Sequence, residues 1–520
     1  MLPLLTGQAV AGESTPSLLW SHEHNGETYL DYSVAIGNHG SEIISDTGLF
    51  TRRTRLYSAS SGAGSPVWQA SSAGQTYEHR AASSPVDNFH AVCRQEPGSS
   101  SYREVVVEGY RSSQATPVWA YRFPETVSGG HVNFCQVSAD GTRVWAAVKG
   151  SNGLHVVALN SSSAGQAVPA LDFSLPFFSS LSTFEISQDG SRAYLANSLY
   201  SKVYDTNSGA LLLDQLVFGG GSAGHSMAAD GKTVAYPSYS GFQVYRESGA
   251  SFSLLRSFEP FGSDSNFSPG AAGLSADGQV LVAAFTELPA VRVAHVFAWN
   301  VNTGQQLLHD IRISNSSSFQ HKVSCVAQSR SATGRFAVGF WGDGGGSVPE
   351  ILVYDRATPS ALYGVQASFD RPGSVRALAI STDGTRLVTS GGTQHINSGT
   401  GNKVVESFDL GSQIRIREMP RVGQTVFVDF YPENNGLALI LDSPLLAPMP
   451  VTMSIGSLYL HRPALVRKVV GFTGKDGRAT LAYTLTQHAV GETRYFQGVS
   501  LTPSGPIILS DEFTALTVLP

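Results

Sequence analysis

The chain has 520 residues and a formal net charge of −6, and only 14% of its residues are charged. This balance argues against nucleic-acid binding, because no long basic run is present that could neutralise a series of phosphates. No apolar segment reaches about 18 residues, so the sequence predicts no membrane span. Glycine is abundant, with 54 residues, and Ser/Thr-rich loops are frequent, which is typical of extracellular all-β proteins. We therefore expect an extracellular, periplasmic or cell-surface location.

Residues 1–14 are interpreted as a leader that precedes the folded part of the chain. Ala9-Val10-Ala11 has the small-x-small pattern of a signal-peptidase site, but the apolar core before it is short and has no basic start. Two interpretations stay open, the remnant of a signal peptide and a disordered leader.

A short turn signal, Ser-x-Asp-Gly, recurs about every fifty residues and sets the architecture. Alternating apolar and polar residues flank it on both sides, a pattern typical of an antiparallel hairpin with one buried face. The clearest copies lie at residues 138–141, 187–190, 228–231, 275–278 and 381–384. Degenerate copies lie at residues 38–40, 87–88 and 333–334.

One complete repeat can be followed around Asp189. Residues 183–187 and 192–196 form the hairpin, residues 202–205 a third strand, and a second turn leads to a fourth strand that begins at Leu211. Four antiparallel strands in this order are one blade of a β-propeller. The eight hairpins predict eight blades, with seven as the alternative if one degenerate copy is a loop insertion.

The two ends of the repeat region are expected to meet. Pro-Val-Trp marks outer strands at residues 66–68 and 117–119, and a related Leu-Leu-Trp at residues 18–20 has no blade of its own. We interpret this N-terminal strand as the fourth strand of the last blade, which removes the open sheet edges and gives a propeller over residues 15–412. The tryptophans Trp20, Trp68 and Trp119 are expected to pack between sheets.

The outer turns at residues 57–62, 204–209 and 299–304 resemble those of PQQ-like and YVTN-type bacterial propeller repeats. The resemblance covers roughly residues 15–412 and implies a fold, not an activity. Enzymes of the PQQ class carry an adjacent cysteine pair beside the quinone, whereas Cys93, Cys135 and Cys325 are far apart in the sequence. We therefore predict no quinone, no other cofactor and no metal site. The cysteines are expected to be buried thiols, with a Cys93–Cys135 pair as the alternative.

The repeating turn pattern stops after the last repeat. Apolar strands over residues 420–520 are separated by Asn-Gly, Gly-Lys-Asp-Gly and Pro-Ser-Gly turns, which predicts a small β-sandwich domain. Residues 473–479 and 495–497 resemble the C-terminal domains of secreted planctomycete-type proteins.

Few residues carry a chemical signal. Gly224-His-Ser-Met-Ala228 is similar to a nucleophile elbow, but it runs into a blade hairpin with no helix after it, so we assign no catalytic residue. His131 and His321 stand several residues before inner strands, so we expect them near one mouth of the channel, with Arg376 close by in the last blade. His225 lies further into its strand and is expected to face the channel or a blade interface. These four are candidate ligand-binding residues, and ordinary rim or packed side chains are the alternative.

Two classes of function remain. The first is a secreted, non-enzymatic binding or structural module, whose partner is a surface glycan, another protein or a second copy of the chain. The second is a propeller enzyme of the lyase, lactonase or dehydrogenase type, with a metal or cofactor at the channel mouth. The residues favour the first, and convergence of three or more ligand-type side chains would favour the second.

Overall fold

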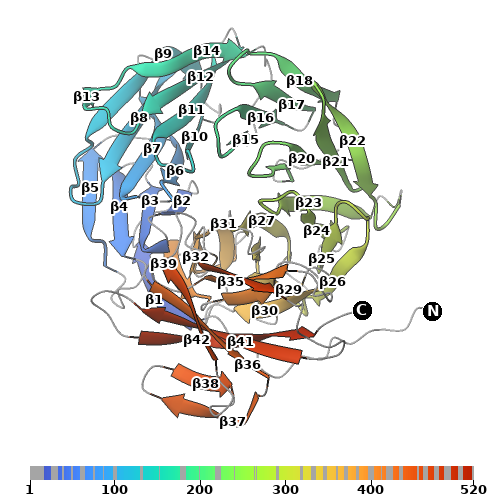
Figure 1. Cartoon of the computed structure of the whole chain (residues 1–520). Helices are drawn as coiled ribbons and strands as arrows, with labels where there is room; N and C mark the ends of the chain where they lie inside the picture. Colours follow the sequence, from blue (N-terminus) through green and yellow to red (C-terminus); the bar gives the residue numbers. More distant parts are fainter. Residues whose placement is uncertain are drawn as a thin grey trace.

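The computed structural model describes residues 17–517 except for short segments, the longest of which are 25–32, 417–424 and 485–492. Eight sheets of four antiparallel strands, one of them extended by a short parallel strand, form the propeller. Figure 1 shows them arranged in a ring. The predicted all-β fold and the count of eight blades are confirmed. We number the blades 1 to 8 in chain order and give their strands from the channel outward.

The first four blades use the following strands. Blade 1 has β2 (Ser33–Gly37), β3 (Glu42–Thr47), β4 (Thr51–Ser58) and β5 (Trp68–Ala73). Blade 2 has β6 (Tyr77–Ser83), β7 (Phe89–Pro97), β8 (Tyr102–Arg111) and β9 (Trp119–Ser128), and the short β13 (Gly165–Gln166) adds to it in parallel. Blade 3 has β10 (Asn133–Val137), β11 (Arg143–Gly150), β12 (Gly153–Asn160) and β14 (Pro169–Leu175). Blade 4 has β15 (Thr183–Ile186), β16 (Arg192–Ala196), β17 (Tyr200–Asp205) and β18 (Leu211–Leu216).

The remaining blades complete the ring. Blade 5 has β19 (Ser226–Met227), β20 (Thr233–Pro237), β21 (Phe242–Ser248) and β22 (Ser251–Phe258). Blade 6 has β23 (Phe267–Leu274), β24 (Val280–Glu287), β25 (Val293–Asn300) and β26 (Gln306–Ile313). Blade 7 has β27 (Val323–Gln328), β28 (Phe336–Phe340), β29 (Ile351–Thr358) and β30 (Ala361–Ala367). Blade 8 has β31 (Ser374–Ile380), β32 (Arg386–Gly392), β33 (Lys403–Asp409) and β1 (Ser17–His24).

Blade 8 is closed by the N-terminal strand. β1 pairs antiparallel with β33, from Ser17 opposite Asp409 to His24 opposite Lys403. The last blade therefore contains strands from both ends of the repeat region, and unfolding either end exposes an edge of the same sheet.

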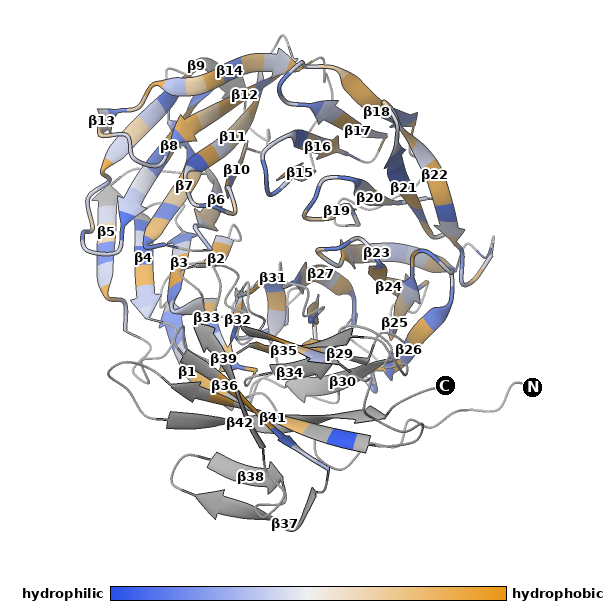
Figure 2. Cartoon of the chain, viewed as in Figure 1, coloured by the Kyte–Doolittle hydropathy of each residue, from blue (hydrophilic) through white to orange (hydrophobic). Residues whose placement is uncertain are grey.

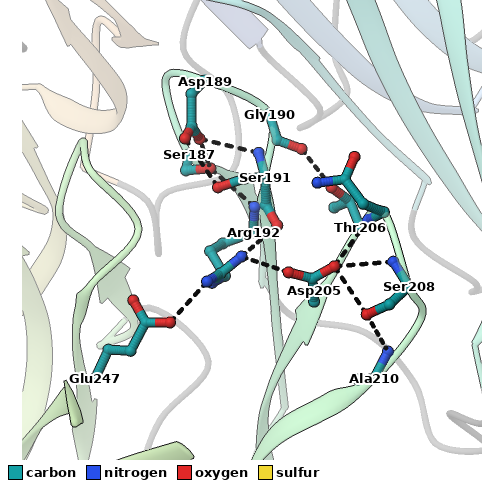
Figure 3. A network of polar contacts seen from close by, with 11 residues as sticks. Ser187, Asp189, Gly190, Ser191, Arg192, Asp205, Thr206, Ser208, Ala210 and Glu247 are labelled. Atoms are coloured by element: carbon teal, nitrogen blue, oxygen red, sulfur yellow. Dashed lines mark hydrogen bonds and ion pairs between the residues drawn. The ribbon is translucent and has the colours of Figure 1, made fainter. Parts of the chain in front are cut away.

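The Ser-x-Asp-Gly turns owe their recurrence to local hydrogen bonding. In blade 4, the Ser187 hydroxyl donates to Asp189 Oδ1 at 2.7 Å, and the same carboxylate oxygen accepts the Ser191 N–H at 2.9 Å. Ser187 Oγ also accepts the Arg192 N–H at 2.9 Å, which ties the start of β16 to the end of β15 (Figure 3). Gly190 has a φ of 72°, which favours glycine at this position.

Arg192 extends this turn into a bridge between blades. Its guanidinium contacts Asp205 at 2.6 Å within blade 4 and Glu247 of β21 at 2.7 Å in blade 5. Figure 3 shows the guanidinium between the two carboxylates. This segment thus reverses the chain between β15 and β16 and also contributes to the contact between neighbouring sheets.

The hydrophobic core consists of layers between adjacent blades. Middle strands such as β24 are buried along nearly their whole length, whereas outer strands such as β14 alternate between half-buried and exposed residues. Figure 2 colours the ribbon by the hydropathy of each residue. Trp20 stacks on Tyr57 with ring centroids 5.0 Å apart, and Trp119 stacks on Phe89 at 6.0 Å. Both indoles are buried, and Trp20 shares a core cluster with blade 1 and Trp119 with blade 3, which confirms that they pack between sheets.

The strands after the propeller form three further sheets, at one side of the ring in Figure 1. They are β34 (Gln413–Ile416), β35 (Thr425–Tyr431) and β40 (Ala479–Thr484); β39 (Val466–Phe472), β36 (Leu437–Ser443), β41 (Thr493–Leu501) and β42 (Ile507–Thr517); and the pair β37 (Leu446–Met453) and β38 (Gly456–Leu460). Because β34 pairs with β35, the first of these sheets begins at Gln413, before the expected boundary at residue 420. The described part of the chain has no helix with the length and apolar character of a membrane span. The leader at residues 1–14 lies outside the described residues.

Candidate functional site: the central channel

The central channel has a volume of about 460 Å³ and is lined by the inner strands of all eight blades. Its walls are mostly small and apolar, with alanines at 35, 82, 272, 327 and 379. Polar groups among the lining residues include Gln136, Glu185, His225, Ser226 and Gln328. The channel lining is therefore mixed, with small apolar side chains and polar groups at defined places.

Three of these polar side chains join one blade to the next. Gln136 Oε1 accepts the Ile186 N–H at 2.7 Å, Glu185 Oε2 accepts the Met227 N–H at 2.9 Å, and Ser226 Oγ accepts the Leu274 N–H at 3.0 Å. The innermost strand of each blade is a sheet edge, whose N–H groups need partners. In blades 4 to 6 a side chain of the preceding blade accepts one of these N–H groups.

The series of acceptors ends at blade 6 for a steric reason. Gln136, Glu185 and Ser226 each stand two residues before the first residue of their turn, and Gly273 occupies that place in blade 6. A Cβ on Gly273 would lie 2.9 Å from Val326 Cγ1 of blade 7. Close approach of the two inner strands thus replaces a side-chain hydrogen bond here.

Replacing Gln136 by leucine is expected to lower the free energy of unfolding by about 1–3 kcal/mol, because the shape is kept while the Ile186 N–H loses its acceptor. Chemical denaturation measures this change. Gln136→Glu keeps an oxygen acceptor and is the matched control, for which we expect a much smaller loss. Equal stability of the leucine variant and the parent chain would show that the Ile186 N–H finds another partner.

His225 lies at the junction of the channel with blade 4. It is buried just before β19, and its Nδ1 lies 3.2 Å from the Tyr194 hydroxyl, which also accepts a hydrogen bond from Ser201 Oγ at 3.0 Å. Burial lowers the pKa of His225 to about 4, so the imidazole is neutral at pH 7. Desolvation raises the pKa of the Tyr194 hydroxyl above its ordinary value. The pair is a neutral hydrogen-bonded contact between two blades.

His225 is expected to make the fold sensitive to acid. Its pKa is about 4 in the folded chain, and the ordinary value of 6.5 applies to the unfolded chain, which therefore binds more protons between these pH values. The contribution of His225 to the free energy of unfolding is complete above about pH 6.5 and is lost progressively as the pH falls toward 4. At pH 5 the free energy of unfolding is lower by about 2 kcal/mol from this group. Unfolding of the parent and His225→Gln chains at pH 7 and 5 tests this. A pH dependence unchanged by the substitution would contradict it.

The other candidate residues occupy different environments. His321 is fully buried before β27 and stacks on Phe340, with ring centroids 4.7 Å apart. Arg376 is half-buried on β31, and neither of these two side chains is among the residues that line the channel. His131 lies outside the described residues. Of the described candidates, the structure brings only His225 to the channel wall, and it does not gather them at one place.

No group of three or more His, Cys, Asp and Glu side chains within the described ranges is placed to hold a metal ion. Gln136 and Glu185 also line the channel and were not candidates from the sequence, and Ser226 entered only in the elbow-like motif that was assigned no catalytic residue. The sequence contains a pattern that could have identified these three residues, because each stands two residues before its turn in three successive repeats. Only the structure shows that this place faces the next blade.

Comparisons with known proteins add a likeness in fold. No protein-family model and no curated protein matches the chain. A solved β-propeller domain of Myceliophteria thermophila Cps50 (Swd1) is 7% identical, with a TM-score of 0.42, over 76% of this chain and 99% of that one. The Dos1 propeller is 11% identical, with a TM-score of 0.47, over 77% of this chain and 97% of that one. At such identities the likeness concerns the fold alone. By its own sheet order, this chain is an eight-bladed β-propeller.

Proposed function

We propose that the chain is a non-enzymatic binding module of the PQQ-like or YVTN-type bacterial kind, which works outside the cytoplasm and takes its ligand at the central channel. The observation that carries this proposal is the use of the channel's polar groups. Gln136, Glu185 and Ser226 accept backbone hydrogen bonds from the next blade, so their place in the channel has a structural reason. A general base or nucleophile instead needs an atom directed at the reacting group.

Gln328 indicates which ligand chemistry suits the channel. Its Oε1 is buried and has no hydrogen-bond partner among the described residues, although the side chain lines the channel. A buried acceptor without a donor costs free energy, and a ligand hydroxyl would remove that cost once the Gln328 amide turns toward the channel. We therefore put a hydroxyl-rich ligand, a surface glycan, ahead of a protein partner or a second copy of the chain.

A glycan array with the purified chain tests this proposal. We expect binding to a defined subset of glycans, weakened at least tenfold by Gln328→Leu. Gln306→Leu, on the exposed outer strand β26, is the matched control and should bind as the parent chain does. A stoichiometric metal found by elemental analysis, together with turnover of a lactone or polysaccharide, would instead favour the enzyme. Absence of glycan binding would direct attention to protein partners.

The division into two domains is also a proposal. The sheets after residue 412 contain only strands from that part of the chain, which supports a propeller over residues 15–412 followed by a separate β-sandwich. Limited proteolysis of the whole chain should then cut first between β33 and β35. Early cleavage inside a blade would contradict this division.

A further inference from the structure

Cys93 and Cys135 face the same layer between two blades. Cys93 lies on β7 of blade 2 and is fully buried, in one core cluster with Phe89 and Trp119 of the same blade. Cys135 lies on β10, the inner strand of blade 3, and packs against that cluster from the other side. Both thiols therefore belong to the interface of blades 2 and 3.

The sulfur of Cys135 lies over the backbone beside Cys93. Its thiol donates to the Arg80 carbonyl oxygen at a distance of 3.4 Å. Arg80 is the residue directly opposite Cys93 in the pairing of β6 with β7. Because residues directly opposite each other in an antiparallel pair have Cα atoms about 4.5–5.5 Å apart, this position brings the Cys135 sulfur to the neighbourhood of the Cys93 side chain.

The electrostatics of Cys135 agree with this proximity. Burial raises the pKa of its thiol well above the ordinary value, the Cys93 side chain raises it further, and the Cys93 N–H group acts in the opposite direction. Both the side chain and the backbone of Cys93 are thus close enough to affect the Cys135 sulfur.

Access and burial give the two thiols different roles. Cys135 lines the channel and is half-buried as a residue, so we expect a small reagent to reach it, whereas Cys93 lies behind it in the core. Cys325 also lines the channel, but it belongs to blade 7, which stands opposite blade 3 in a ring of eight. Cys325 is therefore too far from the blade 3 thiol to pair with it, and its reaction shows whether a reagent enters the channel.

We propose that Cys93 and Cys135 form an oxidisable pair that joins blades 2 and 3 by a disulfide when a small-molecule disulfide enters the channel. The Cys135 thiolate first attacks the reagent, which forms a mixed disulfide and releases one thiol. The Cys93 thiolate then attacks the Cys135 sulfur, so the internal S–S bond forms and the second reagent thiol leaves. The protein loses two hydrogen atoms and two electrons, and the reagent disulfide is reduced to two thiols.

Cystamine is a suitable probe because it is a small disulfide. The reduced native chain is incubated with it at about pH 8.5, near the ordinary thiol pKa, and the remaining thiols are alkylated after denaturation. We expect a cross-linked peptide pair that contains Cys93 and Cys135. The mass of the intact chain should fall by two hydrogens because of this bond. Any cysteamine bound to Cys325 adds its own mass separately. The chain with Cys325→Ser should give the same internal bond and no other adduct.

Cys93→Ala is the deciding variant. With no second thiol to displace it, cysteamine should stay on Cys135, and the mass should rise by one cysteamine there. The proposal is overturned if the parent chain also keeps cysteamine on Cys135 while Cys93 remains open to alkylation. It also fails if Cys135 does not react in the native chain under conditions in which the denatured chain reacts, because the channel would then give no access.

Discussion

Replacing Arg94 by leucine should lower the free energy of unfolding by about 3–5 kcal/mol, because the substitution leaves the Glu108 carboxylate buried without its cation. Arg94 is fully buried on β7, and its two terminal nitrogens donate to the two oxygens of Glu108 at 2.9 and 2.8 Å. The Tyr110 hydroxyl donates to the same carboxylate. Removal of the guanidinium therefore breaks the centre of a buried polar network in blade 2.

The pKa of Arg94 has the direction that such a network requires. Burial alone lowers it, but the hydrogen bonds and the negative charge of Glu108 outweigh burial and raise the pKa above its ordinary value. Unfolding in urea, followed by tryptophan fluorescence, measures the expected loss. The double variant Arg94→Leu with Glu108→Leu removes both charges and should recover much of the stability. If Arg94→Leu alone unfolds at the same urea concentration as the parent chain, the pair contributes little.

Replacing Trp119 by alanine should also cost about 3–5 kcal/mol, because it empties a large volume in the layer between blades 2 and 3. Trp119 is buried, stacks on Phe89 and donates from Nε1 to the Ser161 carbonyl oxygen at 3.4 Å. Gly109 lies directly beneath the ring, where a Cβ would lie only 2.3 Å from Trp119 Cε2. The indole thus covers Gly109 of its own sheet and reaches the Ser161 backbone of blade 3.

Trp68 provides a matched control for Trp119. It stands in the same Pro-Val-Trp motif one blade earlier, stacks on Tyr110 with centroids 5.5 Å apart, and donates to the Ser112 carbonyl oxygen at 3.0 Å. Trp68 is only half-buried, so Trp68→Ala should lose clearly less stability when both variants are compared by urea unfolding. Equal losses would show that burial does not set the cost at this repeated position.

The parts of the fold that the sequence predicts well are those with local causes. The hairpin around Asp189 could be placed because serine and aspartate side chains satisfy the backbone of their own turn, and Gly190 permits its positive φ. The predicted strands at residues 183–187 and 192–196 agree with β15 and β16 to within one residue. Ring closure by β1 could be proposed because an unpaired strand was left at one end of a repeating pattern.

The candidate site was less accessible to sequence reasoning. His321 and Arg376 stand near the start of inner strands, but strand position alone does not tell whether a side chain faces the channel or the adjacent blade. In the structure His321 packs on Phe340, whereas Gln136, Glu185 and Ser226 face the channel wall. The roles of the four candidate residues in ligand binding remain predictions.

Local patterns are sufficient to predict the β-propeller class, the repeat of four strands and a count of eight with seven as the alternative, because turn chemistry and alternating burial act over a few residues. They do not predict which side chains meet between blades. The Gln136 acceptor finds the Ile186 N–H fifty residues away, and Cys135 reaches the layer that holds Cys93. Such contacts depend on the closure of the ring and on the approach of adjacent sheets, and no local pattern encodes either distance.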